Sequence, residues 1–387
     1  METTMHSSPP SFSNPCDVAS ATVHGGSDHQ NGSVPLTSHK RSRNVRYMII
    51  LVINYVLLFV GSVSSSLLAK FYFIHKGSSR WVSAWIQCAG FPILLVPIFL
   101  PYLLNFSTRK PFTDMTPKLF TFSVIVGLFI GVNNLLFSWG TSYLPVSTSS
   151  LVLSTQLAFT LIMSFIIVKQ AIAFNNLNCV VLLTVSSVLL ALGSSHDRPE
   201  GLTKAKYFIG FACTLSAGLL FSLYLPTMEK VYRMIRCYEM VMEMQLVMEM
   251  AATVLATVGM VIEGGVAEMR REANHVFDMG PAWYYGTLVM NIVSWQCCFM
   301  GTAGMVFLTT SVTGGVCVTA LTVANVVGGV VVYHDRFGNE KVVATVLCTW
   351  GFCSYVYGMY VKMKKGEEKL KSRDEMEMMT QRGIGNC

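Results

Sequence analysis

Residues 144–170 read LPVSTSSLVLSTQLAFTLIMSFIIVKQ, a stretch long enough to cross a bilayer as a helix. Its second half is almost purely apolar and closes with Lys169, whereas its first half is polar. A polar group in hydrocarbon costs free energy unless it meets a partner or a water-filled cavity. The stretch therefore predicts a membrane helix that forms part of the wall of a polar pathway. Hydroxyl and amide side chains crowd that first half: Ser147, Thr148, Ser149, Ser150, Ser154, Thr155 and Gln156.

The whole chain has the composition of a multi-span membrane protein. Of its 387 residues, 52% are hydrophobic and 13% are charged, against roughly 25% charged in a soluble domain. The mean hydropathy is +0.50. The net charge of +7 sits at span ends and in the C-terminal tail, without the basic stripe of a nucleic-acid-binding protein. We therefore expect the lipid bilayer, and no nucleic acid, as a partner.

Motifs for catalysis and metal binding are missing from the sequence. The eleven cysteines show no metal-ligand spacing, and most lie in apolar segments, so neither a metal site nor a disulfide framework is predicted. No P-loop, H-E-x-x-H or G-x-S-x-G motif occurs in a suitable context. These observations argue against an enzyme and against an ATP-driven pump, and no cofactor is expected.

Ten segments reach the length needed to span a bilayer. Residues 1–45 are expected to form a disordered cytoplasmic tail, and residues 362–387 a charged cytoplasmic tail. Lys and Arg are more numerous in the segments that lie inside when both termini are cytoplasmic. The predicted spans lie near 47–69, 82–104, 119–142, 146–168, 176–193, 206–228, 238–262, 282–308, 311–333 and 341–361.

The ten spans divide into two halves, residues 46–193 and residues 194–361. Because each half has an odd number of spans, the halves enter the membrane from opposite sides, as in the inverted repeats of secondary transporters. The fourth and ninth spans each begin with hydroxyl or glycine residues and end in a β-branched run followed by a charge. The predicted fold is thus an all-α membrane protein with ten transmembrane helices in two inverted five-helix repeats.

Amides within the third and fourth spans are the first candidates for a binding site. Asn133 and Asn134 lie roughly 12 Å below the outer surface, and Gln156 roughly 15 Å below it. The short loop between these spans predicts that they are neighbours and that the amides line one site. An amide can both donate to and accept from a nitrogen heterocycle, and Trp139 or Trp295 can stack on it. Interhelical hydrogen bonds are the alternative for the amides, and core packing for the tryptophans.

The seventh span carries the carboxylates expected inside the membrane. Glu243 lies about one turn from the interfacial residue Glu239, and Glu249 lies near the middle of the span. An ionised carboxylate there needs a cation, a proton or water, so we predict proton coupling with Glu243 as the preferred carrier. Gln245 and Gln296 are its predicted polar neighbours. The alternative places the start of this Met-rich span in the interface. No Lys or Arg is predicted deep in a span, which argues against an anionic substrate.

Several motifs, spread over residues 47–361, together resemble the plant purine permease family of the drug/metabolite transporter superfamily. The strongest are Gly131–Gly140, Tyr143–Ser150 and Thr155–Phe159. The others are Arg80–Trp81, Gln87–Pro92, Val168–Gln170, Val241–Gln245, Trp295–Cys297, Trp350–Phe352 and Ser354–Gly358.

The resemblance implies two inverted five-helix halves around a central cavity. It also implies proton-coupled uptake of adenine-like bases, with cytokinins, caffeine-like purines, pyridoxine-type vitamins and alkaloids among family substrates. The plasma membrane is the expected location, with endomembranes as the alternative. Thr155, beside Gln156, becomes a further candidate contact. Two departures stand out: Asn133 replaces an acidic residue of many members, and Val323–Val326 replaces their Pro-Val-Thr-Glu stretch. Glu243 or Glu249 would then carry the proton.

We therefore predict a secondary active, proton-coupled transporter of purine bases and related nitrogen heterocycles that works by alternating access. Its driving force would be the proton gradient. The alternative in the same fold is a carrier of another organic cation, alkaloid or vitamin. A non-transporting membrane receptor or scaffold is the alternative from a different class.

Overall fold

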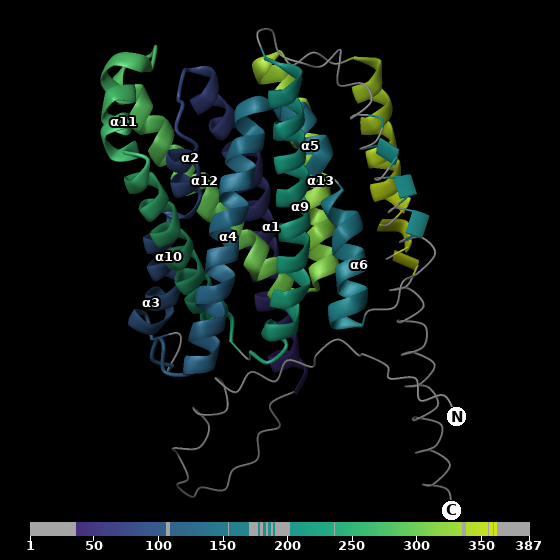
Figure 1. Cartoon of the computed structure of the whole chain (residues 1–387). Helices are drawn as coiled ribbons and strands as arrows, with labels where there is room; N and C mark the ends of the chain where they lie inside the picture. The colour runs from purple at the N-terminus through teal and green to yellow at the C-terminus, as the bar shows by residue number, and fades with distance from the viewer. Residues whose placement is uncertain are drawn as a thin grey trace, which may run out of the picture.

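All regular secondary structure is helical in the part of the chain that the computed structural model describes. That part comprises residues 36–105, 109–153, 155–169, 202–235, 237–334 and 338–354, with scattered positions within 177–189 and 356–361. Figure 1 shows the helices running side by side as one bundle. They are α1 (Leu36–Ile74), α2 (Arg80–Cys88), the 3₁₀ turn η1 (Phe91–Leu94), α3 (Leu95–Leu103), α4 (Pro117–Tyr143), α5 (Val146–Leu153), α6 (Gln156–Val168), α9 (Lys204–Tyr232), α10 (Tyr238–Ile262), α11 (Gly265–Arg271), the π-helix η2 (Glu272–Val276), α12 (Pro281–Leu308) and α13 (Ser311–Tyr333).

Within the described residues, seven helical stretches are long and apolar enough to cross a membrane. They coincide with seven of the predicted spans, which confirms an all-helical membrane protein. Large apolar side chains such as Val52, Val56 and Phe59 are exposed on the outside of the bundle, as expected for contact with lipid. The seven stretches are Tyr47–Ile74, Arg80–Leu103, Pro117–Tyr143, Val146–Val168, Lys204–Tyr232, Tyr238–Ile262 and Pro281–Leu308.

Of the remaining three predicted spans, the ninth is described throughout and the other two are described in part. Residues 311–333 form the helix α13, of which Ala324–Tyr333 is a shorter apolar segment. Residues 339–354 are helical, and so are the described positions within 356–361, so the tenth predicted span is described except at residues 355 and 359. Most of the fifth predicted span, 176–193, also lies outside them, as do both distal tails, 1–35 and 362–387.

Three predicted boundaries differ from the observed helices. The helix α1 begins at Leu36, so residues 36–45, which were expected in the disordered tail, are helical. The second predicted span is divided into α2 and α3 by the turn η1, which contains Pro92, a residue that lacks a backbone donor. The fourth is divided between Leu153 and Gln156. Hydropathy detects the length of a span but not these interruptions.

Local sequence explains where several helices begin. The Thr116 hydroxyl accepts a hydrogen bond from the Leu119 amide at 3.3 Å, directly before Pro117 opens α4. Thr203 caps α9 in the same way, and Thr310 caps α13. A threonine oxygen at this position satisfies one of the amides that a helix start leaves without a partner. The short polar turns between spans are therefore also the signals that start the next helix.

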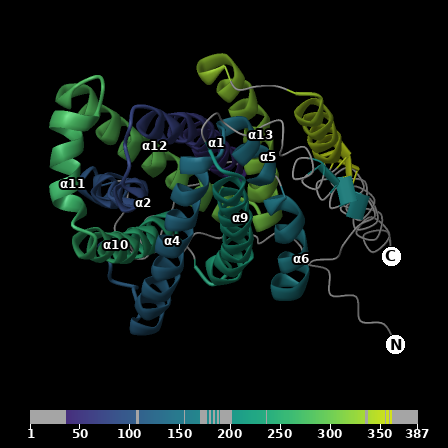
Figure 2. The ribbon, with the colours of Figure 1, turned by 45° about the horizontal axis from the view of Figure 1, so that its top comes forward.

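The two predicted halves interleave instead of forming separate bundles. Helix α1 packs along α12, and α5 packs on α13. Helix α9 packs on both α4 and α6 and lies between them in both views (Figures 1 and 2). The third and fourth spans are thus separated by α9 along most of their length, although a short turn joins them. This corrects the expectation that they are direct neighbours.

Helices α1 and α12 approach each other closely because of two glycines. A Cβ added at Gly301 would lie 2.4 Å from the Leu58 amide nitrogen, and one added at Gly61 would lie 2.3 Å from that of Cys298. No larger residue fits at either position without moving backbone. Small residues at a helix crossing allow such contact in membrane proteins. The crossing brings polar residues of α1 and α12 to the same interior space.

Candidate functional site

An interior cavity of about 100 Å³ lies where α1, α2, α4, α5, α6, α9, α12 and α13 meet. This volume is well below the roughly 300–1,000 Å³ typical of sites for drug-sized ligands. Among the described residues, none that lines it is charged, and four aromatic residues contribute to the wall: Phe137, Phe221, Trp295 and Phe299. Its polar wall consists of Ser62, Ser65, Ser66, Gln87, Asn133, Asn134, Ser150, Gln156, Thr302 and Asn325.

The three predicted amides meet in this cavity. Asn133 and Asn134 reach it from α4, and Gln156 reaches it from the first position of α6. The Asn133 Oδ1 and Asn134 Nδ2 atoms are buried and have no hydrogen-bond partner among the described residues. Buried polar atoms are usually satisfied. Unsatisfied amide atoms on residues of a cavity wall are candidates for hydrogen bonds to a ligand.

Only one of the two predicted stacking residues lies at the cavity. Trp295 lines it and makes an edge-to-face contact with Phe137, with ring centroids 5.3 Å apart. Trp139 does not line it. The guanidinium carbon of Arg80 lies 4.2 Å from the centroid of the Trp139 ring, a cation–π contact outside the cavity. Among the two, the geometry favours Trp295 as the aromatic surface for a ligand.

Thr155 also lies outside the cavity wall. Its hydroxyl donates to the Val152 carbonyl at 2.7 Å, at the interruption between α5 and α6. It is 4% exposed. This geometry assigns Thr155 to the local turn that positions its neighbour Gln156.

Gln245, Glu249 and Gln296 form a second polar cluster that does not line the cavity. The Glu249 Oε1 atom accepts from Gln245 Nε2 at 2.9 Å and from Gln296 Nε2 at 3.4 Å. The other carboxyl oxygen is buried without a partner among the described residues. Because Gln296 follows the cavity residue Trp295 directly, the cluster lies one residue behind the cavity wall.

Glu243 is engaged elsewhere, in an ion pair that the sequence did not predict. Arg109, in the connection between α3 and α4, donates to both oxygens of Glu243, at 2.9 and 3.0 Å. The Phe112 amide adds a third bond at 3.0 Å. Burial opposes the charge on Arg109, but its hydrogen bonds to Glu243 and Asp114 raise the pKa of Arg109 above its ordinary value. A carboxylate held by a bidentate guanidinium is stabilised in its charged form.

Other cavity residues were missed because nothing in their local sequence distinguishes them. Gln87 appeared only within a family motif, and Asn325 only within the stretch that departs from the family. The serines of α1 at positions 62, 65 and 66 occur in an apolar helix, where small hydroxyl residues are common at helix contacts. Their separation by three or four residues, which places them on one face, was the available signal.

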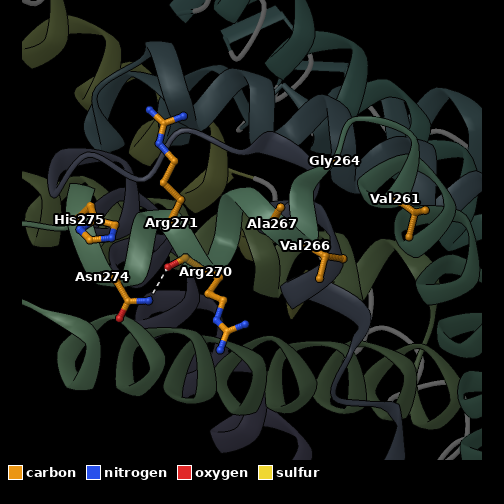
Figure 3. Close-up of a pocket in the computed structure, with 8 residues that line it drawn as sticks. All are labelled: Val261, Gly264, Val266, Ala267, Arg270, Arg271, Asn274 and His275. Atoms are coloured by element: carbon orange, nitrogen blue, oxygen red, sulfur yellow. Dashed lines mark hydrogen bonds between the residues drawn. The ribbon is translucent and has the colours of Figure 1, made fainter.

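A second hollow lies on the outside of the bundle, along α11 and the end of α10 (Figure 3). Its volume is about 780 Å³, and it is lined by residues such as Val266, Arg270 and His275. The Arg270 and Arg271 side chains extend away from the helix in Figure 3, and both are exposed. With no buried, unpartnered polar atom in its lining among the described residues, this hollow lacks the features of the interior cavity.

An all-helical bundle with an uncharged, amide-lined cavity between its helices defines a multi-pass membrane protein of the transporter class. Comparison with known proteins identifies the family. The family model described as purine nucleobase transmembrane transport (PUNUT) matches residues 49–365. The chain therefore belongs to the purine nucleobase transmembrane transporter family, whose members are transporters and not enzymes.

Curated relatives from Arabidopsis thaliana support this assignment. The chain is 63% identical over 299 residues to "Probable purine permease 4", covering 77% of this chain and 78% of the relative. It is 33% identical over 351 residues to "Purine permease 3", covering 87% of this chain and 99% of the relative. The resemblance to plant purine permeases that the motifs indicated is thus confirmed.

Proposed function

We propose that the chain transports neutral purine bases and related nitrogen heterocycles by proton-coupled alternating access. The observation that carries this proposal is the cavity: among the described residues, its wall contains unpartnered amide groups and aromatic rings and no charged side chain. A neutral ligand with donors and acceptors at its edge complements such a wall, whereas a phosphate or carboxylate would need a basic partner. Adenine and cytokinin-type bases fit this description.

We assign the coupling proton to Glu249 in preference to Glu243. The Glu249 carboxyl is fully buried, and among the described residues its hydrogen-bond partners are neutral amides. A buried carboxyl without a cation must exchange its charge for a proton. Glu243 is already neutralised by Arg109, so protonating it would break two charge-assisted bonds. Coupling between the two sites requires that the conformations of the transport cycle differ in their affinity for the proton and for the substrate. Gln296 provides the link, because it bonds to Glu249 and follows the cavity residue Trp295.

We further propose ten transmembrane helices in two inverted repeats, with both termini in the cytoplasm. Support comes from α6 and α13, the fourth and ninth predicted spans. Helix α6 ends at Lys169 in a left-handed conformation, with the Lys169 amide donating to the Ser164 carbonyl. Helix α13 ends in the same way at His334, whose amide donates to the Gly329 carbonyl. The two helices thus share the same type of ending, and the odd number of predicted spans in each half gives the inverted orientation. The plasma membrane is the proposed location.

Transport of an organic cation in the same fold is the second candidate function. It is less well supported because no carboxylate lines the cavity. Alkaloids and vitamins that are neutral at the pH of transport remain within the proposed chemistry. Competition of each compound against labelled adenine distinguishes them.

Reconstituted vesicles test the coupling assignment. In the wild type, a proton gradient is expected to drive accumulation of labelled adenine, and preloaded adenine is expected to support counterflow without a gradient. Glu249→Gln should lose accumulation but keep counterflow, because the neutral amide mimics the protonated acid. Glu243→Gln is the matched control: it should lower the yield of folded protein but keep accumulation per molecule. Accumulation retained by Glu249→Gln would refute the assignment, and a wild type without adenine flux would refute purine transport itself.

A further inference from the structure

We propose that Gln87 determines specificity, its side-chain oxygen accepting a hydrogen bond from an N–H group of the substrate. This inference deepens the proposed function, because it rests on a neutral heterocycle occupying the interior cavity. Gln87 lies on α2, is 2% exposed and lines that cavity.

Hydrogen bonds determine the orientation of the Gln87 amide. The Nε2 group donates to the Ser138 hydroxyl at 2.8 Å and to the carbonyls of Ser83 and Asn134, each at 3.2 Å. Amide orientation in a protein is assigned from such a network. A reversed amide would place its oxygen against two carbonyl oxygens, which cannot donate. The orientation with Nε2 toward these groups is therefore the one that the surroundings permit.

The opposite atom of the same amide, Oε1, is buried and meets no donor among the described residues. Because the two N–H groups of Nε2 are shared among these three acceptors, turning the oxygen toward another partner would break those bonds. Buried acceptors are rarely left unpaired in native proteins. An acceptor that is locked in place, buried and part of a cavity wall is suited to a donor carried by the ligand.

Trp295 supplies the complementary atom on α12. Its indole nitrogen can only donate, and it is likewise buried without an acceptor among the described residues. Two residues of the cavity wall, Gln87 and Trp295, thus carry one acceptor and one donor whose chemical identity is unambiguous. Together they select a ligand that carries both an N–H group and a bare ring nitrogen. A heterocycle whose N–H groups are alkylated leaves Gln87 Oε1 unpaired.

Sites built to hydrogen-bond a substrate reject analogues that lack the group, because buried polar atoms are then left unpaired. We therefore expect the wild type to discriminate against at least one N-alkylated purine by about tenfold or more. The assay measures how well unlabelled 9-methyladenine and N6,N6-dimethyladenine inhibit the uptake of labelled adenine. The discrimination ratio is the half-inhibiting concentration of each analogue divided by that of unlabelled adenine in the same variant. A ratio within one variant does not depend on expression level.

Gln87→Met removes the oxygen while approximately preserving side-chain length, and should bring the discrimination ratio close to one. Asn291→Leu is the matched control. Asn291 is 2% exposed and also has a buried unpartnered oxygen, but it does not line the cavity. It should retain the wild-type ratio. Unchanged discrimination in Gln87→Met, or equal loss in both variants, would overturn the proposal.

A second measurement covers the case in which Gln87→Met is folded but transports nothing. Ligand-induced thermal shifts of the purified protein then give the same ratios, with the same expected and contradicting results. If Gln87→Met does not fold, Gln87→Asn withdraws the oxygen from the cavity while keeping an amide, and loss of discrimination is again expected.

If the wild type takes up no purine, the proposed function fails separately. Benzimidazole against 1-methylbenzimidazole then tests Gln87 by thermal shift, and equal binding of the two by the wild type would overturn its role.

Discussion

Breaking the Arg109–Glu243 pair from one side will destabilise this transporter, whereas removing both partners will restore most of the stability. The Glu243 side chain is fully buried, and that of Arg109 is 9% exposed. The two groups share a bidentate contact, to which the Phe112 amide adds a third bond. Arg109→Met leaves the Glu243 carboxylate buried without its cation. The double variant Arg109→Met/Glu243→Met leaves no buried charge.

The expected magnitudes follow from the burial of both groups. Removing one partner of a buried ion pair costs about 3–5 kcal/mol, because the remaining charge is not compensated. Replacing both partners by apolar residues of similar volume is often nearly neutral. The two single changes should therefore be strongly non-additive, with a coupling energy of about 1–3 kcal/mol or more. Asp114→Asn provides a matched control. Asp114 also contacts Arg109 but is 61% exposed, so little change is expected.

Heat denaturation of purified protein in detergent, followed by size-exclusion chromatography, measures the effect. Since unfolding of such proteins is often irreversible, midpoints are compared at one heating rate. Arg109→Met should lower the midpoint by several degrees, and the double variant should lie close to the wild type. Equal midpoints for Arg109→Met and the double variant would refute the reasoning, because the penalty would then not come from an unpaired Glu243. Loss of pH-dependent uptake in a stable double variant would indicate that Glu243, and not Glu249, carries the coupling proton.

Two further predictions concern packing and the aromatic wall. Gly301→Ala should abolish the folded protein, because its Cβ would lie 2.4 Å from the backbone nitrogen of Leu58. Gly286→Ala on the same helix meets nothing within 4 Å and should be tolerated. The chromatographic yield of each variant checks this prediction, and equal yields would contradict it. Trp295→Phe should raise the half-saturating adenine concentration about five- to tenfold by removing the indole donor. Trp139→Phe, outside the cavity, should change that concentration little. Initial uptake rates measure both values, and a larger increase in Trp139→Phe than in Trp295→Phe would contradict the assignment.

The helices themselves could be predicted from the sequence, because the bilayer imposes a local requirement. Each span must be about 20 apolar residues long and must satisfy its own backbone, so segments such as 238–262 are visible without knowledge of their neighbours. The predicted span coincides with α10 at both ends. The similar depth of Asn133, Asn134 and Gln156 was also predictable, since depth below the surface follows from the rise per residue of a helix. That these amides line one cavity was predicted from direct contact between their helices, whereas the structure places α9 between α4 and α6.

Lateral arrangement was not predictable in the same way. The insertion of α9 between α4 and α6 depends on which apolar faces pack best, and apolar faces look alike in sequence. Pairing of polar groups has the same difficulty. Arg109 and Glu243 are 134 residues apart, and no spacing rule connects them. Trp139 looked equivalent to Trp295 until the structure placed Arg80 over the Trp139 ring.

The sequence by itself determined that this is a helical membrane transporter of the purine permease type, because hydropathy, motif content and the absence of catalytic patterns are properties of the chain alone. The tertiary structure decided which buried polar atoms have partners. Within the part of the chain that the structure describes, Glu243 is paired with Arg109, and the hydrogen-bond partners of the Glu249 carboxyl are amides. In that same part, the Gln87 amide nitrogen has acceptors and its oxygen has no donor. That distinction requires three-dimensional contacts, because a polar group in an apolar environment acquires its role from the atoms that surround it.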